Sequence, residues 1–195
     1  YAETVKQSEQ DIIHILDQFK HYQLKPAALE ARLSLVIQYF KDRPYCAVKD
    51  CAVGVEGEGD GDGYMTRHGC PHLQQDPIYR TDAFVCNTLV QTVLALIQSN
   101  TLAEFNRNII AVRYGAAHES SNPIHYYNRN HFISADFNPI NQKNGFLINV
   151  TGQGDLAHYV KQTSAVIDRQ SWFDHNLQPK NLKATLRVLS SQNGE

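Results

Sequence analysis

The chain has 195 residues, with 18 basic and 20 acidic side chains and a formal net charge of -2. This length suits one domain with a sizeable core, so we predict a single domain over 1–195 with an inserted loop at about 49–80. Basic and acidic residues are nearly equal in number, and the basic residues form no stripe along the sequence, so we expect no nucleic-acid partner. No apolar run is long enough to span a bilayer, so we expect no membrane span.

The N-terminal part predicts two helices. Residues 3–20 carry apolar side chains at 12, 15, 16 and 19, which form one helical stripe. Pro26 suits the start of a second helix that continues to Phe40. The segment 49–80 that follows is rich in Gly, Asp, His and Cys, and a loop of that length in a compact domain is usually functional.

A third helix is predicted over about 84–99, because its residues are apolar around most of the circumference. Thr81 and Asp82 are the candidate N-caps. Cys86 falls in the first turn, where the positive end of the helix dipole favours a nucleophilic thiolate. The alternative is that Cys86 is a small buried cysteine with a packing role.

The second half predicts one more helix and then strands. Thr101 suits an N-cap, with Glu104 in the capping-box position. Strands are predicted over 109–114, 131–134 and 146–151, the last from its alternation of side chains. Helices followed by strands predict the α+β class.

A catalytic cysteine needs a base, which in turn needs an orienting partner. If 131–137 and 145–151 form a hairpin, His131 and Asn149 become diagonal neighbours on one face. Asn149 would then hold the imidazole, as in Cys-His-Asn sites. The alternatives are a structural or surface role for His131 and a strand-edge or bulge role for Asn149.

Five short segments occur in an order and spacing that carry a family resemblance. They are YFKDRPYCAV, FVCNTLVQTVLAL, VRYG, NRNHFISADF and GFLINVT, within residues 35–151. The chain resembles the bacterial N-acetylmuramoyl-L-alanine amidase-like family, which looks like a branch of the NlpC-type cell-wall cysteine peptidases. The resemblance implies a papain-like α+β fold, with a central helix packed on an antiparallel sheet and extra N-terminal helices.

The resemblance also implies roles for individual residues. Cys86 matches the nucleophile, His131 the base and Asn149 the third, polar residue. Tyr45 matches a tyrosine that lines the site and contacts substrate in related enzymes. The remaining matches surround the histidine and are expected to support the site: Arg129, Asn130 and Asp136.

Two positions depart from the family pattern. Val85 stands where the family has an aspartate that, in related peptidases, helps bind the free amine of the substrate. Gln91 stands where the family prefers glutamate. Each change removes a carboxylate and its charge-assisted contacts, so the substrate can differ while the chemistry stays intact.

The inserted loop raises three further possibilities. The stretch EGEGDGDG at 56–63 alternates acid with glycine, which suits either calcium or a solvated loop, although it lacks the EF-hand pattern. A Cys51–Cys70 disulfide is preferred over a Cys46–Cys51 bridge. Structural zinc is less favoured, and its possible ligands are Cys46, Cys51, His68, Cys70 and His72.

The sequence therefore predicts a cysteine hydrolase that cleaves an amide or peptide bond through an acyl-enzyme, without a cofactor or catalytic metal. Peptidoglycan stem peptides or another small peptide are the expected substrates. The alternatives are an amidase or acyl transferase acting outside the wall, and a metal- or disulfide-stabilised binding module with a vestigial site. Tyr1 is not a translation start, so we expect a removed leader and a secreted or periplasmic protein.

Overall fold

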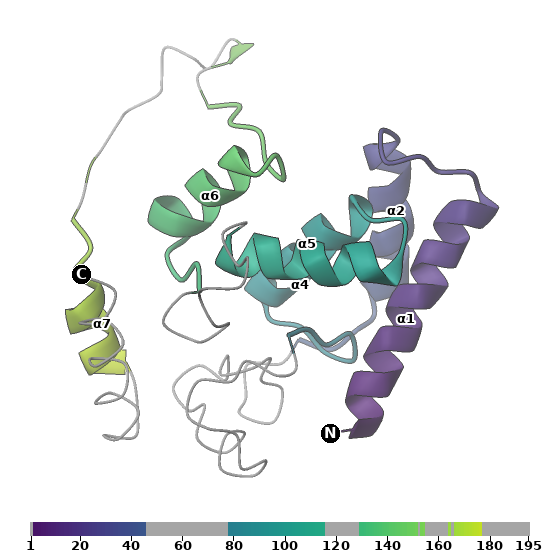
Figure 1. Cartoon of the computed structure of the whole chain (residues 1–195), viewed down its shortest axis with the longest axis horizontal. Coiled ribbons are helices and arrows are strands. Elements are labelled where there is room, and N and C mark those ends of the chain that lie inside the picture. Colours follow the sequence, from purple (N-terminus) through teal and green to yellow (C-terminus); the bar gives the residue numbers. More distant parts are fainter. Residues whose placement is uncertain are drawn as a thin grey trace.

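The structure is a computed structural model that describes residues 2–45, 78–115, 129–151, 153–154, 164 and 166–176. Two N-terminal helices, α1 (Ala2–His21) and α2 (Leu29–Phe40), lie beside a central pair, α4 (Cys86–Ile97) and α5 (Leu102–Tyr114) (Figure 1). A π-helical turn, η3 (Ile133–Phe137), runs directly into α6 (Asn138–Lys143). The last described helix is α7 (Arg169–Asn176).

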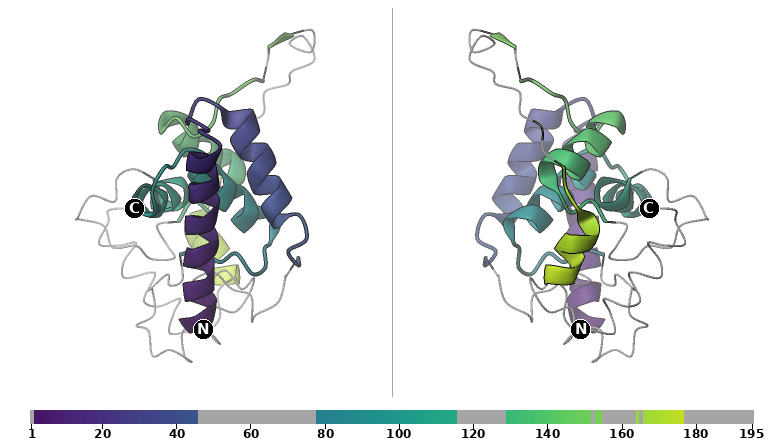
Figure 2. Two further views of the ribbon diagram at one scale, coloured as in Figure 1. Left: turned by 90° about the vertical axis from the view of Figure 1, so that its right-hand side faces the viewer. Right: turned by 90° about the vertical axis from the view of Figure 1, so that its left-hand side faces the viewer.

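One hydrophobic core joins these helices. Helix α1 contributes its predicted stripe, and α4 packs most extensively against α5, with α2 on its other side. Figure 2 shows α1 running along one side of this assembly. The innermost side chains come from all four long helices and from η3: Ile12, Ile15, Phe19, Val36, Ala95, Leu96, Phe105, Ile109, Val112 and Phe137.

The buried Arg32 side chain connects α2 to the end of α4 through hydrogen bonds. Its guanidinium donates to the carbonyl oxygens of Ile97 at 3.0 Å and Ser99 at 2.9 Å, and to Asn100 Oδ1 at 2.7 Å. It also donates to the Leu24 carbonyl and stacks 4.5 Å from the ring centroid of Phe19. Burial lowers the pKa of Arg32, against the opposing charge of Glu104. The last carbonyl groups of a helix have no hydrogen-bond donor within the helix, and at the end of α4 Arg32 is the donor.

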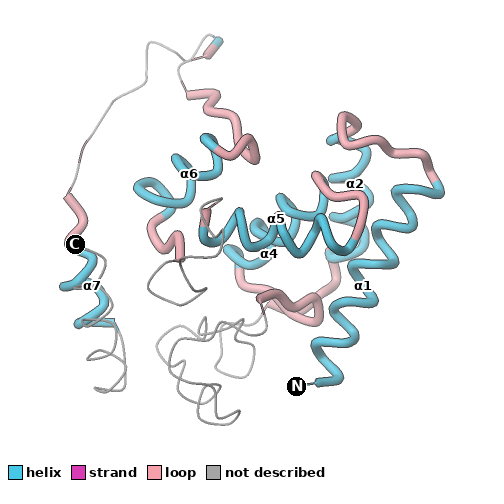
Figure 3. Tube along the Cα trace, in the orientation of Figure 1, coloured by secondary structure: helices cyan, strands magenta, loops and turns pink. Residues whose placement is uncertain are grey.

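The predicted α+β class and the papain-like core with an antiparallel sheet are wrong for the described residues, which are mostly helical and contain no strand (Figure 3). The predicted strand 109–114 is the second half of α5. Thr101 Oγ1 accepts from the Glu104 N–H at 3.1 Å, and Glu104 accepts from the Asn100 N–H, so the predicted cap is confirmed. Once this cap starts a helix, the buried positions 105, 109 and 112 keep helical spacing.

The predicted strand 131–134 is also wrong, because η3 takes up its second half and the first two residues form no strand. The Phe132 carbonyl accepts from the N–H groups of Asp136 at 2.7 Å and Phe137 at 3.0 Å, which closes the wide turn. The predicted strand 146–151 has no strand partner among the described residues. Instead, the N–H groups of Phe146 and Leu147 donate to the Asn141 carbonyl. The hairpin of 131–137 with 145–151 is therefore absent, and α6 with its early proline occupies the position of the predicted turn.

Candidate active site

Cys86 is the first residue of α4 and is exposed, so the alternative of a buried structural cysteine does not hold. The N-cap is Val85, not the predicted Thr81 or Asp82. A valine side chain has no atom that can accept a hydrogen bond from the free N–H groups at the helix start. The hydroxyl of Thr88 bonds the Val85 backbone there. Its Oγ1 accepts from the Val85 N–H and donates to the Val85 carbonyl, both at 3.1 Å. The thiol thus lies at a helix start, where backbone dipoles stabilise negative charge.

The segment that leads into Cys86 is anchored to α1. Thr81 donates from its backbone N–H to Ser8 Oγ at 3.1 Å and from its Oγ1 to Asp11 Oδ2 at 2.6 Å. Burial alone would raise the pKa of Asp82, but hydrogen bonds from Arg80 and from the backbone outweigh it and lower that pKa. These polar contacts fix the backbone immediately before the nucleophile.

Asp11 also holds the segment that leads into Tyr45. Buried Asp11 accepts from Tyr39 Oη at 2.9 Å and from the Arg43 guanidinium at 3.1 Å. Burial, followed by the hydrogen bond and charge of Asp11, raises the pKa of Tyr39. One carboxylate on α1 therefore ties together both segments that border the site.

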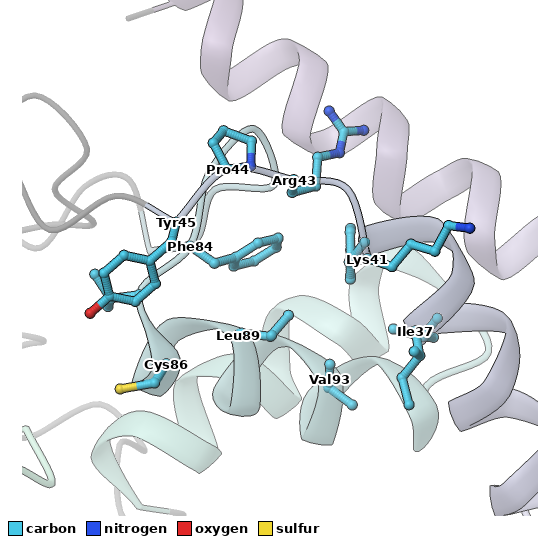
Figure 4. A pocket seen from close by; sticks show the side chains of 12 residues that line it. Ile37, Lys41, Arg43, Pro44, Tyr45, Phe84, Cys86, Leu89 and Val93 are labelled. Carbon is cyan, nitrogen blue, oxygen red and sulfur yellow. The ribbon is translucent and has the colours of Figure 1, made fainter.

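Tyr45 and Cys86 lie at the same end of one groove. The Phe84 N–H donates to the Pro44 carbonyl at 3.1 Å, and Tyr45 pairs with Phe84 in an isolated parallel bridge. The Tyr45 side chain is 72% exposed, and Figure 4 shows its ring beside Cys86. Tyr45 and Cys86 thus line the same groove, and the contact of Tyr45 with substrate stays a prediction.

The groove has a volume of about 410 Å³ and runs from Cys86 along α4 to the end of α2. Figure 4 shows Leu89 and Val93 between Cys86 at one end and Ile37 at the other. Val85, directly before the candidate nucleophile, belongs to its lining. The lining is Val36, Ile37, Phe40, Lys41, Arg43, Pro44, Tyr45, Phe84, Val85, Cys86, Leu89 and Val93.

The predicted base, His131, lies in an aromatic cluster directly before η3. Its ring centroid is 5.2 Å from that of Trp172 on α7 and 6.4 Å from that of Phe132. The Phe132 and Trp172 rings meet edge to face at 5.2 Å. The His131 ring therefore lies beside the side chains of Phe132, the residue before η3, and of Trp172 on α7 in this cluster.

Asp136 connects this cluster to α7. It is buried, forms an ion pair of 2.6 Å with Arg169, and accepts from the Phe132 N–H at 3.3 Å. The Arg169 guanidinium also lies 5.6 Å from the ring centroid of Phe132. Asp136 therefore joins η3 to α7 next to His131, and its predicted role in the site stays a prediction. Arg169 and Trp172 escaped the sequence analysis, although Trp172 is the single tryptophan of the chain.

Asn149 does not sit on a sheet face beside His131. It is exposed, and its Oδ1 accepts from the Thr151 N–H at 2.9 Å in a local turn. The hairpin geometry from which its contact with His131 was predicted is absent. Its assignment as a catalytic residue remains a prediction that rests on the resemblance alone.

The two residues before His131 contact the end of α5 and the histidine backbone. Buried Asn130 donates from its backbone to the Arg113 carbonyl at 2.8 Å and from Nδ2 to the Val112 carbonyl at 3.2 Å. Arg129 is half-buried, and its carbonyl accepts from the His131 N–H at 2.9 Å. The predicted residues thus fall into two groups. Tyr45 and Val85 lie with Cys86 at the groove, whereas Arg129, Asn130 and Asp136 lie around His131.

The metal and disulfide predictions for the loop at 46–72 lie outside the described residues. Within the part that the structure describes, no three His, Cys, Asp or Glu side chains come together as a metal site. No helix among those residues is long and apolar enough to cross a membrane.

Comparisons with known proteins place this site in a family. No curated protein matches the chain. The crystal structure of protein LPG0564 from Legionella pneumophila str. Philadelphia 1, which carries the family model DUF1460, is similar with a TM-score of 0.63 and 26% identity. The similarity covers 99% of this chain but 60% of that protein, so the chain spans well under two thirds of its length.

The family model described as AmiA-like, N-acetylmuramoyl-L-alanine amidase-like, matches residues 61–192. The match spans the segments around Cys86, His131 and Trp172. It confirms the resemblance to the amidase-like family, while the placement among NlpC-type peptidases stays a prediction. This chain belongs to the N-acetylmuramoyl-L-alanine amidase-like family.

Proposed function

We propose that this protein is a cysteine amidase that cleaves an amide bond of peptidoglycan, in the stem peptide or at its junction with the glycan. The observation that carries the proposal is an exposed Cys86 at the start of α4, at the end of a groove and beside Tyr45. Membership in an amidase-like family supports an amidase chemistry and a substrate in the cell wall. Because peptidoglycan lies outside the cytoplasm, we propose that the enzyme acts in the periplasm or outside the cell.

The proposed reaction proceeds in two steps. His131 takes the thiol proton, and the Cys86 sulfur attacks the scissile carbonyl carbon. The C–N bond then breaks, and the amine leaves with the proton from the imidazole. Water attacks the resulting thioester, which releases the carboxylic acid and returns the thiol. The Cys86 backbone N–H, at the free start of a helix, is one donor to the oxyanion.

The proposal is tested by digesting purified peptidoglycan and identifying the released fragments by mass spectrometry. Wild-type protein should release fragments, and Cys86→Ala and His131→Ala should release none. Arg107→Ala, an exposed change on α5, is the matched control and should leave release unchanged. Release by Cys86→Ala at the wild-type rate would overturn the cysteine mechanism. Fragments with new amino and carboxyl ends at one bond would identify that bond.

Val85 favours a second candidate function, that of an amidase or acyl transferase acting on a substrate outside the wall. It lines the groove at the position where the family carries an amine-binding aspartate. A library of short N-acyl amino acid amides discriminates the two candidates. Turnover of these amides without any release from peptidoglycan would support the second candidate, and the reverse result would exclude it.

A further inference from the structure

We propose that the groove beside Cys86 binds an uncharged aliphatic substituent of the substrate, carried next to the carbonyl that the thiol attacks. This inference rests on the proposed function and assigns the substrate class of the same site. It is drawn from the composition of the groove, from the charges around it and from its continuity with the nucleophile.

The walls of the groove are mostly apolar, with Lys41 and Arg43 as their two charged residues. Val36, Phe40 and Phe84 are almost completely buried and form its floor, whereas Ile37 is 53% exposed at its far end. On α4, Leu89 and Val93 follow Cys86 at helical spacing, and all three belong to the lining of the groove. Figure 4 shows the Cys86 sulfur at the end of the groove, directed away from Leu89. From Cys86 to Val93 the helix rises about 10 Å, which gives the groove the length of an extended aliphatic chain.

The charges around the groove disfavour a cationic ligand. Among the described residues that line it there is no carboxylate, and the two charged side chains, Lys41 and Arg43, are both basic. Arg43 is paired with Asp11, and Lys41 lies at the exposed rim, 4.0 Å from Asp42. A free ammonium in the groove would meet cations and lose its hydration without a partner. Val85 is consistent with this preference, because by the family resemblance it stands where related peptidases have an aspartate that binds a free amine.

Alkyl reagents test the groove without knowledge of the natural substrate. N-alkyl iodoacetamides, from N-methyl to N-octyl, transfer their acetamide group to the thiolate and release iodide. The rate of Cys86 alkylation is followed by peptide mass mapping on the full chain, with glutathione as the reference thiol. Each methylene that enters the groove should raise the rate constant by about two- to fourfold, until the chain fills the groove. An N-(2-ammonioethyl) reagent should react more slowly than the N-propyl reagent.

A matched pair of α2 variants locates the effect. Ile37→Glu places a carboxylate at the far end of the groove, and Leu33→Glu places one a turn earlier, outside its lining. Both positions are more than one third exposed, so both variants should fold. Ile37→Glu should flatten the dependence on chain length, and should speed the ammonium reagent by up to about fivefold. Leu33→Glu should behave as wild type.

The outcomes separate the two proposals. Rates that do not depend on chain length, or an equal effect of Ile37→Glu and Leu33→Glu, would overturn the groove assignment. The reactivity of Cys86 toward the N-methyl reagent bears on the proposed function instead. If it does not exceed that of glutathione at mildly acidic pH, the activated nucleophile is excluded, while the dependence on chain length still decides the groove.

Discussion

Thr81 donates from Oγ1 to Asp11 Oδ2 at 2.6 Å, and this hydrogen bond joins the middle of α1 to the segment that ends at the candidate nucleophile. The two residues are far apart in sequence, and both are buried. Because Asp11 also accepts from Tyr39 and Arg43, a single carboxylate connects α1, α2 and both borders of the groove.

We expect Asp11→Asn to lower the free energy of unfolding by about 2 to 3 kcal/mol, because an amide cannot accept from all of these donors. Asp17→Asn is the matched control on the same helix. Asp17 is exposed and pairs with Lys20, so its change should cost at most about 0.5 kcal/mol. Urea unfolding measures both, and equal costs would show that the Asp11 network contributes nothing to stability.

Arg32 gives a second prediction about stability. Arg32→Lys keeps the charge but loses the planar fork that reaches several carbonyls at once. We expect a loss of about 3 kcal/mol in the free energy of unfolding, since buried carbonyls at the end of α4 lose their donor. The exposed Arg107→Lys should be neutral. A neutral Arg32→Lys would show that lysine or water replaces these hydrogen bonds.

The ion pair between Asp136 and Arg169 should hold α7 against His131. Since Trp172 is the only tryptophan, its fluorescence reports this docking directly. In Arg169→Met we expect a red-shifted Trp172 emission and increased quenching by iodide, as the ring becomes more exposed. Lys143→Met, an exposed change on α6, should leave both unchanged. An unaltered spectrum in Arg169→Met would mean that the ion pair does not hold the helix.

The raised pKa of Tyr79 leads us to expect that the folded protein becomes less stable at alkaline pH. Burial, followed by the charge of Glu9, raises the pKa of Tyr79 to about 12, whereas an unfolded tyrosine titrates near about 10. The folded state therefore retains the phenol proton longer. The resulting stability is fully present below about pH 10 and is lost as the pH rises through about 12.

The measurement is urea unfolding between about pH 8 and pH 11.5. Tyr79→Phe keeps the ring that packs edge to face on Phe105 at 4.8 Å, and it should flatten the alkaline decline. Tyr22→Phe, at a position 58% exposed, should retain the wild-type decline. The same slope in both variants would exclude Tyr79 as its source.

The sequence predicted the helical half of the fold well, because its signals there are local. The apolar stripe of α1, the course of α2 and the capping pair Thr101 and Glu104 all appear in the structure. Cys86 in the first turn of its helix and the family of the chain were also predictable. Periodicity and caps act over a few residues, so they can be read without knowledge of the rest of the molecule.

The predicted strands failed because β-branched runs do not define their own partners. The mostly apolar residues 109–114 could form either a strand or a buried helix. They belong to α5, the helix that begins after its N-cap Thr101. Residues 131–134 and 146–151 would need each other as strands, but the carbonyls of Phe132 and Asn141 hold the neighbouring N–H groups instead. Strand pairing is a long-range property, and an error in one strand removes its partner as well.

The chain by itself determined α1 and α2, a helix with the candidate nucleophile Cys86 in its first turn, and the family. The tertiary structure alone decided what surrounds that nucleophile. The contacts of Asp11 with Thr81 and of Asp136 with Arg169, and the apolar groove between α2 and α4, join residues distant in sequence. No local pattern encodes such contacts, because they depend on which faces the packed helices bring together.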